Sequence, residues 1–242
     1  MQLDFAAREL TIKLVYYGPA LSGKTTNLQV LHELSTDETK GRLMTLETRD
    51  DRTLFFDLLP LTFKSDRDFS VRLKLYTVPG QVIHASTRKL VLQGADGVAF
   101  IADSQVSETR NNAASFKDLK ENLREQGIEL GRMPLVIQFN KQDLPTARSE
   151  LEIIAQAQRG KEPVFCASAV QHRGVIETFV GLLFLTWQSL DKTHGLSSKV
   201  GLDRDKFFRD ITNRFRGKRP LLELLQSAHT AQGRELSKEL SP

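Results

Sequence analysis

The sequence predicts an α/β domain built on a mostly parallel six-stranded sheet with helices on both faces. Short apolar runs alternate with longer helical patterns, which is the order expected when crossover helices connect parallel strands. Two of the runs, GVAFIAD (97–103) and PLVIQFN (134–140), are almost continuously apolar, as strands covered on both faces are. A third run leads into a glycine-rich turn and then a helical pattern, which completes a strand–turn–helix unit.

The remaining strands follow from composition and alternation. TIKLVYY (11–17) is β-branched and aromatic and ends at Gly18, so it is expected to form the strand before the turn. Polar and apolar residues alternate in FSVRLKLYTV (69–78), which predicts a strand paired with TLFFDLLPLTF (53–63). PVFCASA (163–169) is a weaker sixth run.

The helices are expected between these strands. The first, over residues 23–34, starts inside the glycine-rich turn and has Leu28, Leu31 and Leu34 at three-residue spacing. The other helical patterns cover roughly 82–93, 108–126, 147–158 and 172–190. We therefore expect a domain over residues 1–190.

Length, apolar content and cysteine usage limit the class of protein. A chain of 242 residues, 40% of them hydrophobic, can bury a full core as one domain with an appendage. It contains no run of about 18 apolar residues, and its N-terminus shows no apolar signal-peptide core. The single cysteine, Cys166, excludes an intrachain disulfide and fits a reducing compartment, so we expect a cytoplasmic protein.

The positive charge lies in the C-terminal extension. Residues 1–198 carry 24 basic and 24 acidic side chains, whereas residues 199–242 carry 10 and 6. Residues 191–242 are therefore predicted to be a linker followed by a basic extension. Because the rest of the chain is neutral and shows no nucleic-acid docking motif, we expect no nucleic-acid partner.

A phosphate-binding loop is predicted at residues 18–25, GPALSGKT, which match G-x-x-x-x-G-K-[ST] between a strand and a helix. The glycines let backbone N–H groups converge on phosphates, and the helix N-terminus adds partial positive charge. Lys24 is expected to reach the β- and γ-phosphates during catalysis, and the Thr25 hydroxyl to bind Mg²⁺. The predicted phosphate-binding residues of the loop are Gly18, Leu21, Ser22, Gly23, Lys24, Thr25 and Thr26.

A guanine site is predicted from the motif NKQD, which follows an apolar strand. Asp143 can accept two hydrogen bonds from guanine, whereas adenine would leave this carboxylate unpaired. Asn140 is expected to support the loop and contact the base, and the stem of Lys141 to lie over the ring. The motif CASAV adds a second loop, in which the Ala169 N–H meets the guanine O6 and Ser168 braces Asp143.

In this order, the three loops resemble those of Ras-like small GTPases. The stretches YYGPALSGKTTNL, DRTLFFDLLPL, LYTVPGQ, ADSQ and NKQDLP resemble the MglA family of bacterial GTPases, which set cell polarity and gliding motility, over about residues 8–190. The resemblance implies a Ras-like P-loop GTPase that binds GTP or GDP with Mg²⁺ and hydrolyses GTP slowly. It also implies a roadblock-type GTPase-activating partner related to MglB, polarity or motility effectors, and recruitment to a cell pole or the inner membrane face.

The resemblance assigns further roles. Thr53 looks like the switch I threonine that contacts Mg²⁺ and the γ-phosphate, and Gly80 like the switch II glycine whose N–H meets the γ-phosphate. Gln81 looks like the residue that orients the attacking water. Arg52 resembles the family's intrinsic arginine finger, with Arg49 as a rival. Phosphoryl transfer depends mainly on such positioning and charge neutralisation.

Two positions depart from the usual GTPase pattern. Thr77 stands where most GTPases place the aspartate that holds Mg²⁺ through water, a change that the MglA relatives share. Asp57 is a candidate to supply the missing charge; alternatively, it is a strand carboxylate facing solvent. Ala20 replaces a glycine beside the γ-phosphate, where its methyl group either blocks the catalytic side chains or is tolerated. We expect hydrolysis to be slowed but not abolished.

The extension is predicted to contain an amphipathic helix over residues 202–220, since Phe207, Ile211 and Phe215 recur at four-residue spacing until Pro220. Three interpretations compete: a solvated tail, a helix docked on the domain, and a weak contact of residues 199–219 with an anionic membrane or acidic partner. The competing overall hypothesis is a GTP-locked or weakly active scaffold that recruits polarity partners through this tail.

Overall fold

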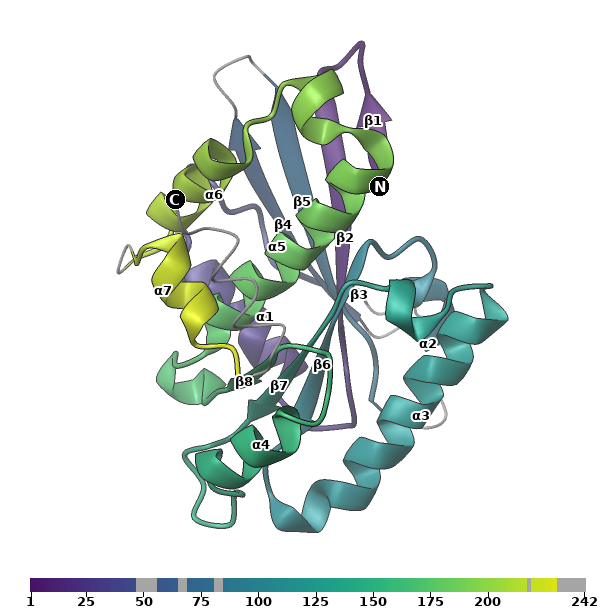
Figure 1. The fold of residues 1–242 in the computed structure, drawn as a ribbon, viewed down its shortest axis with the longest axis vertical. Helices are drawn as coiled ribbons and strands as arrows, with labels where there is room; N and C mark the ends of the chain where they lie inside the picture. Colours follow the sequence, from purple (N-terminus) through teal and green to yellow (C-terminus); the bar gives the residue numbers. More distant parts are fainter. Residues whose placement is uncertain (47–55, 65–68, 81–84, 217–218, 230–242) are drawn as a thin grey trace.

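The computed structural model describes residues 1–46, 56–64, 69–80, 85–216 and 219–229 (Figure 1). Its centre is one sheet, whose described strands are β1 (Gln2–Asp4), β2 (Glu9–Tyr17), β3 (Met44–Leu46), β4 (Phe56–Lys64), β5 (Ser70–Thr77), β6 (Gly97–Asp103), β7 (Leu135–Asn140) and β8 (Val164–Cys166). The strand order is β3-β4-β5-β2-β6-β7-β8, with β1 paired to β2.

All six predicted strands are present, but the sheet in the described residues has eight. The two additional strands, β1 and β3, have three residues each and pair antiparallel with β2 and β4. Segments this short show no period that a sequence pattern could reveal. β5, β2, β6, β7 and β8 are parallel neighbours, so the prediction of a mostly parallel sheet is confirmed.

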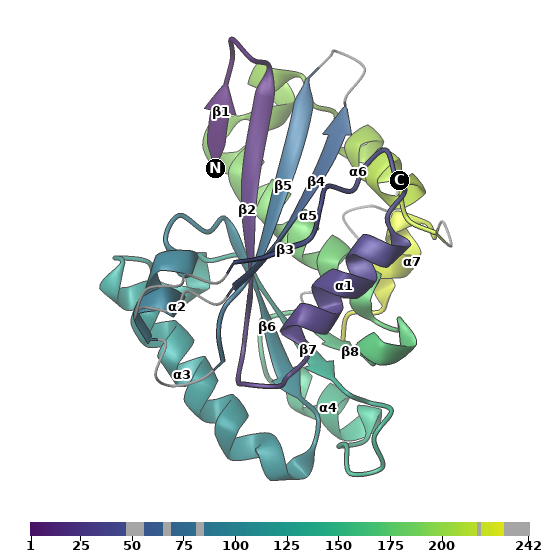
Figure 2. The ribbon, with the colours of Figure 1, turned by 180° about the vertical axis from the view of Figure 1, so that it is seen from behind.

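Helices cover both faces of the sheet, as predicted. Residues of β2 alternate between two buried clusters: Leu14 and Tyr16 belong to one, and Val15 and Tyr17 to the other. The first cluster includes residues of α1 and α5, and the second includes residues of α2 and α3 (Figures 1 and 2). The helices are α1 (Lys24–Leu34), α2 (Ala85–Leu92), α3 (Thr109–Glu125), α4 (Glu150–Ala157), α5 (Val175–His194), α6 (Arg204–Asn213) and α7 (Leu221–Gln226), with single 3₁₀ turns at Val106–Glu108, Leu130–Arg132 and Ala169–Gln171.

Local capping explains where two helices differ from the predicted ranges. α4 begins at Glu150 rather than at 147, because Ser149 and Glu152 form a reciprocal capping box. α5 continues past the predicted domain end to His194, where Gly195 adopts a left-handed conformation (φ 69°). The predicted linker that follows contains a single π-helical turn, Leu196–Val200. The division of the chain at residue 190 stays a prediction.

The C-terminal extension packs on α5 as a third layer. Most of α5 is buried around its whole circumference, because the sheet covers one side and the extension the other. Three ring pairs join the two: Phe207 with Trp187 (4.4 Å between centroids), Phe208 with Phe184 (5.4 Å) and Phe215 with Phe179 (5.6 Å). The prediction of an apolar helix face in the extension is confirmed for Phe207, Phe208 and Ile211, whereas the predicted Phe215 lies beyond the end of the helix.

The predicted extent of the first extension helix was wrong. α6 ends at Asn213, seven residues before Pro220, which instead caps α7. The chain leaves the helix because its backbone pairs with the end of α1: the Thr36 N–H donates to the Arg214 carbonyl (2.9 Å) and the Arg216 N–H to the Leu34 carbonyl (2.8 Å). These hydrogen bonds replace those of a further helical turn.

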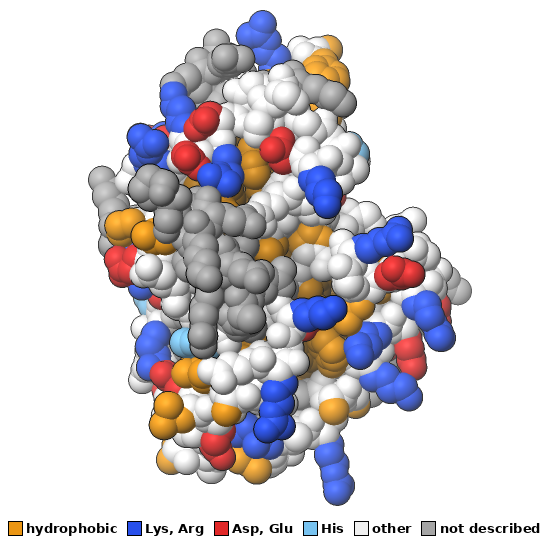
Figure 3. Space-filling view, viewed as in Figure 1, with side chains coloured by type: hydrophobic (Ala, Val, Ile, Leu, Met, Phe, Trp, Pro, Cys, Tyr) orange, Lys and Arg blue, Asp and Glu red, His pale blue; other side chains and the backbone are white. Residues whose placement is uncertain are grey.

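Docking on the domain is thus the interpretation of the extension that the structure favours. A solvated tail is wrong for residues 204–216 and 219–229, most of whose apolar side chains lie in the main core. The face that would enter a membrane is the face already buried against α5. On the surface in Figure 3, Lys and Arg side chains are interspersed with Asp and Glu. In the described part of the chain, no helix is long and apolar enough to cross a bilayer.

Candidate functional site

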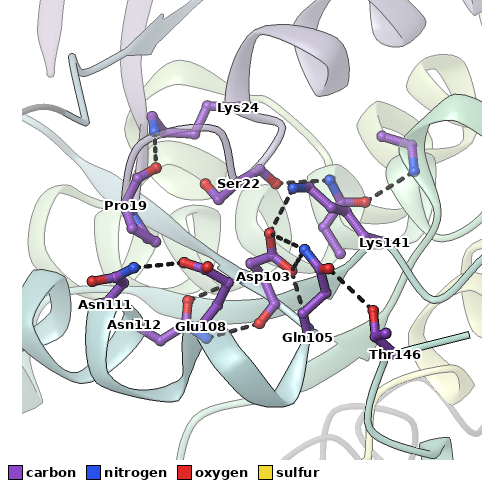
Figure 4. Close-up of polar contacts among 12 residues, drawn as sticks. Pro19, Ser22, Lys24, Asp103, Gln105, Glu108, Asn111, Asn112, Lys141 and Thr146 are labelled. Carbon is purple, nitrogen blue, oxygen red and sulfur yellow. Dashed lines mark hydrogen bonds and ion pairs between the residues drawn. The ribbon is translucent and has the colours of Figure 1, made fainter. Parts of the chain in front are cut away.

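The predicted phosphate loop lies between β2 and α1, at the carboxyl ends of the parallel strands (Figure 4). Gly18 (φ 144°) and Gly23 (φ 93°) have backbone conformations that favour glycine. A Cβ on Gly18 would lie 2.2 Å from the Ile101 carbonyl oxygen, and one on Gly23 2.2 Å from Asn140 Nδ2. Only glycine fits at either position, so the loop is packed closely against β6 and the predicted guanine motif.

Lys24 is buried beneath this loop. Its ammonium donates to the carbonyl oxygens of Gly18 (3.0 Å) and Pro19 (2.6 Å). Burial lowers the pKa of Lys24 to about 8, an effect that nearby Asp57 opposes and Arg88 reinforces. An anionic phosphate would compensate this burial better than neutral carbonyl groups do, which fits the predicted role of Lys24.

The other loop residues are placed for backbone rather than side-chain contacts with phosphate. Leu21 has a positive φ of 61° and its side chain is 88% exposed. Ser22 is fully buried, and its Oγ has no hydrogen-bond partner among the described residues. Thr26 lies partly buried in the first turn of α1. Their phosphate contacts therefore remain predictions that concern the backbone N–H groups.

Asp57 of β4 joins the phosphate loop to the neighbouring strands β3 and β5. Its Oδ2 accepts hydrogen bonds from Thr25 Oγ1 (2.6 Å) and Thr77 Oγ1 (2.9 Å), and its Oδ1 from Thr45 Oγ1 (2.9 Å). The side chain is only 6% exposed, so a strand carboxylate facing solvent is ruled out. Its backbone N–H also donates to Thr77 Oγ1 (2.9 Å), so β4 brings a carboxylate to the place where β5 carries only a hydroxyl.

This cluster fits a hard cation. Carboxylate and hydroxyl oxygens are the ligands that Mg²⁺ prefers, together with phosphate oxygens. A cavity of about 620 Å³ opens beside the cluster and is lined by Lys24, Thr25, Asp57, Thr77 and Gly80, among others. The predicted phosphate-binding residues and the Asp57 cluster thus face one space, as a nucleotide–Mg²⁺ complex would require.

Ala20 lies against Gly80, the predicted switch II glycine. A Cβ on Gly80 would lie 2.3 Å from the Ala20 backbone nitrogen, so residue 80 can carry no side chain in this arrangement. The Ala20 position therefore borders the region where the predicted catalytic groups act. Arg49, Arg52, Thr53 and Gln81 lie outside the described residues.

The two predicted guanine loops are joined by side chains. Asn140 Nδ2 donates to the Ser22 carbonyl (2.8 Å), and its Oδ1 accepts from the Ala169 N–H (2.9 Å). Ser168 Oγ donates to Asp143 Oδ1 (2.5 Å), which is the predicted brace. Asp143 is exposed, so its carboxylate can meet a ligand. In this conformation the Ala169 N–H is already used by Asn140, so a guanine O6 would share that donor.

Lys141 has a left-handed backbone (φ 70°), and its ammonium lies 2.6 Å from Asp103 Oδ2 at the end of β6. Left-handed conformations of residues other than glycine are uncommon and cluster at functional sites. The NKQD motif predicts the role of Lys141 but not its partner, because the two residues are far apart in the chain.

A second polar cluster was missed for the same reason. Arg88 Nε of α2 donates to Asp118 Oδ2 of α3 (2.8 Å), and the Tyr17 hydroxyl donates to the same carboxylate. Asn122 Nδ2 donates to the Tyr17 oxygen (2.9 Å), and burial raises the pKa of the Tyr17 hydroxyl. Since Tyr17 precedes Gly18, this cluster fixes the start of the phosphate loop relative to α2 and α3.

Known proteins resemble this chain over most of its length. Residues 3–183 match the model of the ADP-ribosylation factor family. Over 190 residues the chain is 45% identical to the mutual gliding-motility protein MglA of Myxococcus xanthus (strain DK1622), an alignment that covers 78% of this chain and 97% of that protein. The chain belongs to the MglA-type small GTPases. The GTPase binds guanine nucleotides and hydrolyses GTP. The match to the ADP-ribosylation factor family ends inside α5, before α6 and α7.

Proposed function

We propose that this GTPase is a slow molecular switch in bacterial cell polarity or gliding motility, and that it cycles between GTP and GDP with Mg²⁺. The process is suggested by the related MglA, whose name places it in gliding motility. The observation that carries the switch mechanism is the contact of Asp57 with Thr25 and Thr77 beside the buried Lys24. In this proposal Asp57 supplies, from β4, the carboxylate that the TVPG motif lacks.

The chain's residues have complementary tasks in this proposal. Lys24 and the loop N–H groups hold the phosphates, and Thr25 and Thr53 bind Mg²⁺, with Asp57 fixing the Thr25 hydroxyl. When bound, Mg²⁺ neutralises charge on the phosphates. The Gly80 N–H and Gln81 act at the γ-phosphate and the attacking water, respectively.

Arg52 completes the reacting site in this proposal by neutralising charge on the transferring group. The guanine is bound by Asn140, Lys141, Asp143, Ser168 and Ala169.

The proposed partners are a roadblock-type GTPase-activating protein related to MglB and effectors of polarity or motility, with recruitment from the cytoplasm to a pole or the inner membrane face. Any contact of residues 199–219 with an anionic surface would be electrostatic and salt-sensitive, because the apolar face of α6 is buried. The scaffold hypothesis is not favoured, because both the relationship to MglA and the match to the ADP-ribosylation factor family support a GTP-hydrolysing enzyme.

The experiment is single-turnover GTP hydrolysis by the purified chain with Mg²⁺, with and without a roadblock-type activator. Stimulation by the activator is expected. Asp143→Asn should shift the binding preference from GDP to xanthosine diphosphate, because an amide can donate to the xanthine O2. A chain that binds adenine and guanine nucleotides equally well, or never turns over GTP, would contradict the proposal.

A further inference from the structure

The side chain of Lys141 is held at its tip by a carboxylate that is itself almost completely buried. Asp103 is 4% exposed, and its Oδ2 lies 2.6 Å from Lys141 Nζ. Figure 4 shows the lysine crossing from the guanine motif to the end of β6, with its ammonium over the Asp103 carboxylate. A buried carboxylate needs a paired charge and hydrogen bonds, so this contact is a fixed element of the fold.

Asp103 is fixed from three further directions. Its backbone N–H donates to Asn112 Oδ1 (3.0 Å), and its carbonyl oxygen accepts from Asn112 Nδ2 (2.8 Å). Its Oδ1 accepts from the Gln105 N–H (3.0 Å), and the Gln105 side chain contacts both carboxylate oxygens (3.3 Å each). The backbone of Asp103 is therefore held by α3 and its carboxylate by Gln105, independently of a nucleotide.

The segment after β6 is also hydrogen-bonded to the segment that follows the NKQD motif. Thr146 Oγ1 donates to Gln105 Oε1 (3.1 Å), and the Arg148 N–H donates to the Ser104 carbonyl (2.9 Å). The end of β6 and the segment after the NKQD motif thus form one unit. Lys141 crosses that unit, so its position depends on Asp103 and not on the guanine loop alone.

Without Asp103, the Lys141 side chain would no longer be held in one conformation. The side chain has about 2 kcal/mol of rotamer entropy, and its ammonium is strongly hydrated. Anchoring the ammonium restricts the methylene stem to the line between residues 141 and 103. We infer that Asp103 is a positioning residue for the nucleotide: it holds Lys141 so that the stem lies over the guanine ring, and thereby slows nucleotide release. The inference rests on the guanine site of the proposed function.

The matched substitution is Asp103→Asn. An asparagine keeps an acceptor for the Gln105 N–H and keeps the backbone bonds to Asn112, but it replaces Oδ2 by a donor that faces the ammonium. The readout is dissociation of fluorescent GDP from the full chain with Mg²⁺. Loss of one charged hydrogen bond predicts release about tenfold faster. Glu108→Gln removes a charge from the adjoining 3₁₀ turn and should leave the rate unchanged.

A double-mutant cycle separates positioning from a general structural role. Lys141→Met should also accelerate release, and the double variant should match Lys141→Met within about twofold, because Asp103 acts through the lysine. If Asp103→Asn accelerates release equally in the native and Lys141→Met backgrounds, the inference is wrong. It is also wrong if Asp103→Asn changes nothing while Asp143→Asn weakens GDP binding, an outcome that leaves the guanine site standing. If Asp143→Asn has no effect either, the proposed guanine site itself fails.

A second comparison covers the case in which Asp103→Asn does not fold. Lys141→Arg can still pair with Asp103, whereas Lys141→Gln has no charge to pair. Arginine should hold release within about threefold of the native rate, while glutamine should release as fast as methionine does. Equal rates for arginine and glutamine would overturn the inference.

Discussion

Replacing Phe207 by alanine tests whether the extension is part of the folded core. Its ring is 6% exposed, stacks on Trp187 (4.4 Å, 24° between planes) and meets the edge of Phe63 in β4 (6.4 Å). Phe→Ala substitutions at such sites cost about 3–5 kcal/mol, because the surroundings close the cavity only partly. For a chain of this size each kcal/mol lowers Tm by about 2–4 °C, so a fall of about 10 °C is expected.

The assay is thermal unfolding of the GDP-bound chain, with Phe5→Ala as the matched control. Phe5 is 66% exposed, so its removal should change the free energy of unfolding by no more than about 0.5 kcal/mol. Hydrogen exchange at α6 should increase in Phe207→Ala alone. Equal melting of both variants would refute the packing of α6 on α5 as the basis of the third layer.

Three further results are expected. Asp57→Asn should raise the Mg²⁺ concentration that is needed to slow GDP release, and this increase should be about tenfold or more. Asp37→Asn, at an exposed carboxylate, should leave that concentration unchanged. Equal Mg²⁺ titrations of the two variants would remove Asp57 from the site. Because the pKa of Lys24 is about 8 before phosphate binds and rises when it does, GDP binding should take up about 0.1 proton at pH 7 and about 0.9 at pH 9. Calorimetry in buffers of different ionisation enthalpy measures this uptake, and a constant value would contradict it. Ala20→Gly should speed single-turnover hydrolysis about tenfold, or ~1.4 kcal/mol; an unchanged rate would show that the methyl group is tolerated.

The binding loops could be predicted because their chemistry is local in the sequence. Gly18 and Gly23 stand where a Cβ would collide with Ile101 or Asn140, and the motif records that constraint directly. The brace from Ser168 to Asp143 was also predicted, since each residue belongs to a recognisable loop. In each of these loops a short sequence motif specifies the backbone conformation.

The role of Asp57 could not be settled in this way. Whether a carboxylate in β4 faces solvent or the phosphate loop depends on the register between β4 and β5. That register is set by seven residue pairs, from Leu58 with Tyr76 to Lys64 with Ser70. A shift by one residue would turn the Asp57 side chain to the other face of the sheet, and no local pattern excludes that shift.

The docking of the extension did leave a signal in the sequence. A surface helix packed on a sheet needs one apolar face, yet the stretch FVGLLFLTW within α5 is apolar around the helix. Such a helix must be covered on its outer side as well, and the aromatic residues Phe207, Phe208 and Phe215 follow it along the chain. The apolar circumference of α5 and the aromatic residues of the extension, taken together, favour a docked tail over a solvated one.

Strand β4 contacts both the phosphate loop and the extension. β4 carries Asp57, which meets the Thr25 hydroxyl, and six residues later Phe63, which meets the ring of Phe207. The pairing of β4 with β5 fixes the spacing between these two contacts, so the packing that α6 provides helps to hold the strand from which the carboxylate projects. Asp57 itself lies between β5 and β3, where it pairs with Thr45. The contact of Asp57 with the phosphate loop and the packing of the added layer are therefore linked through one strand.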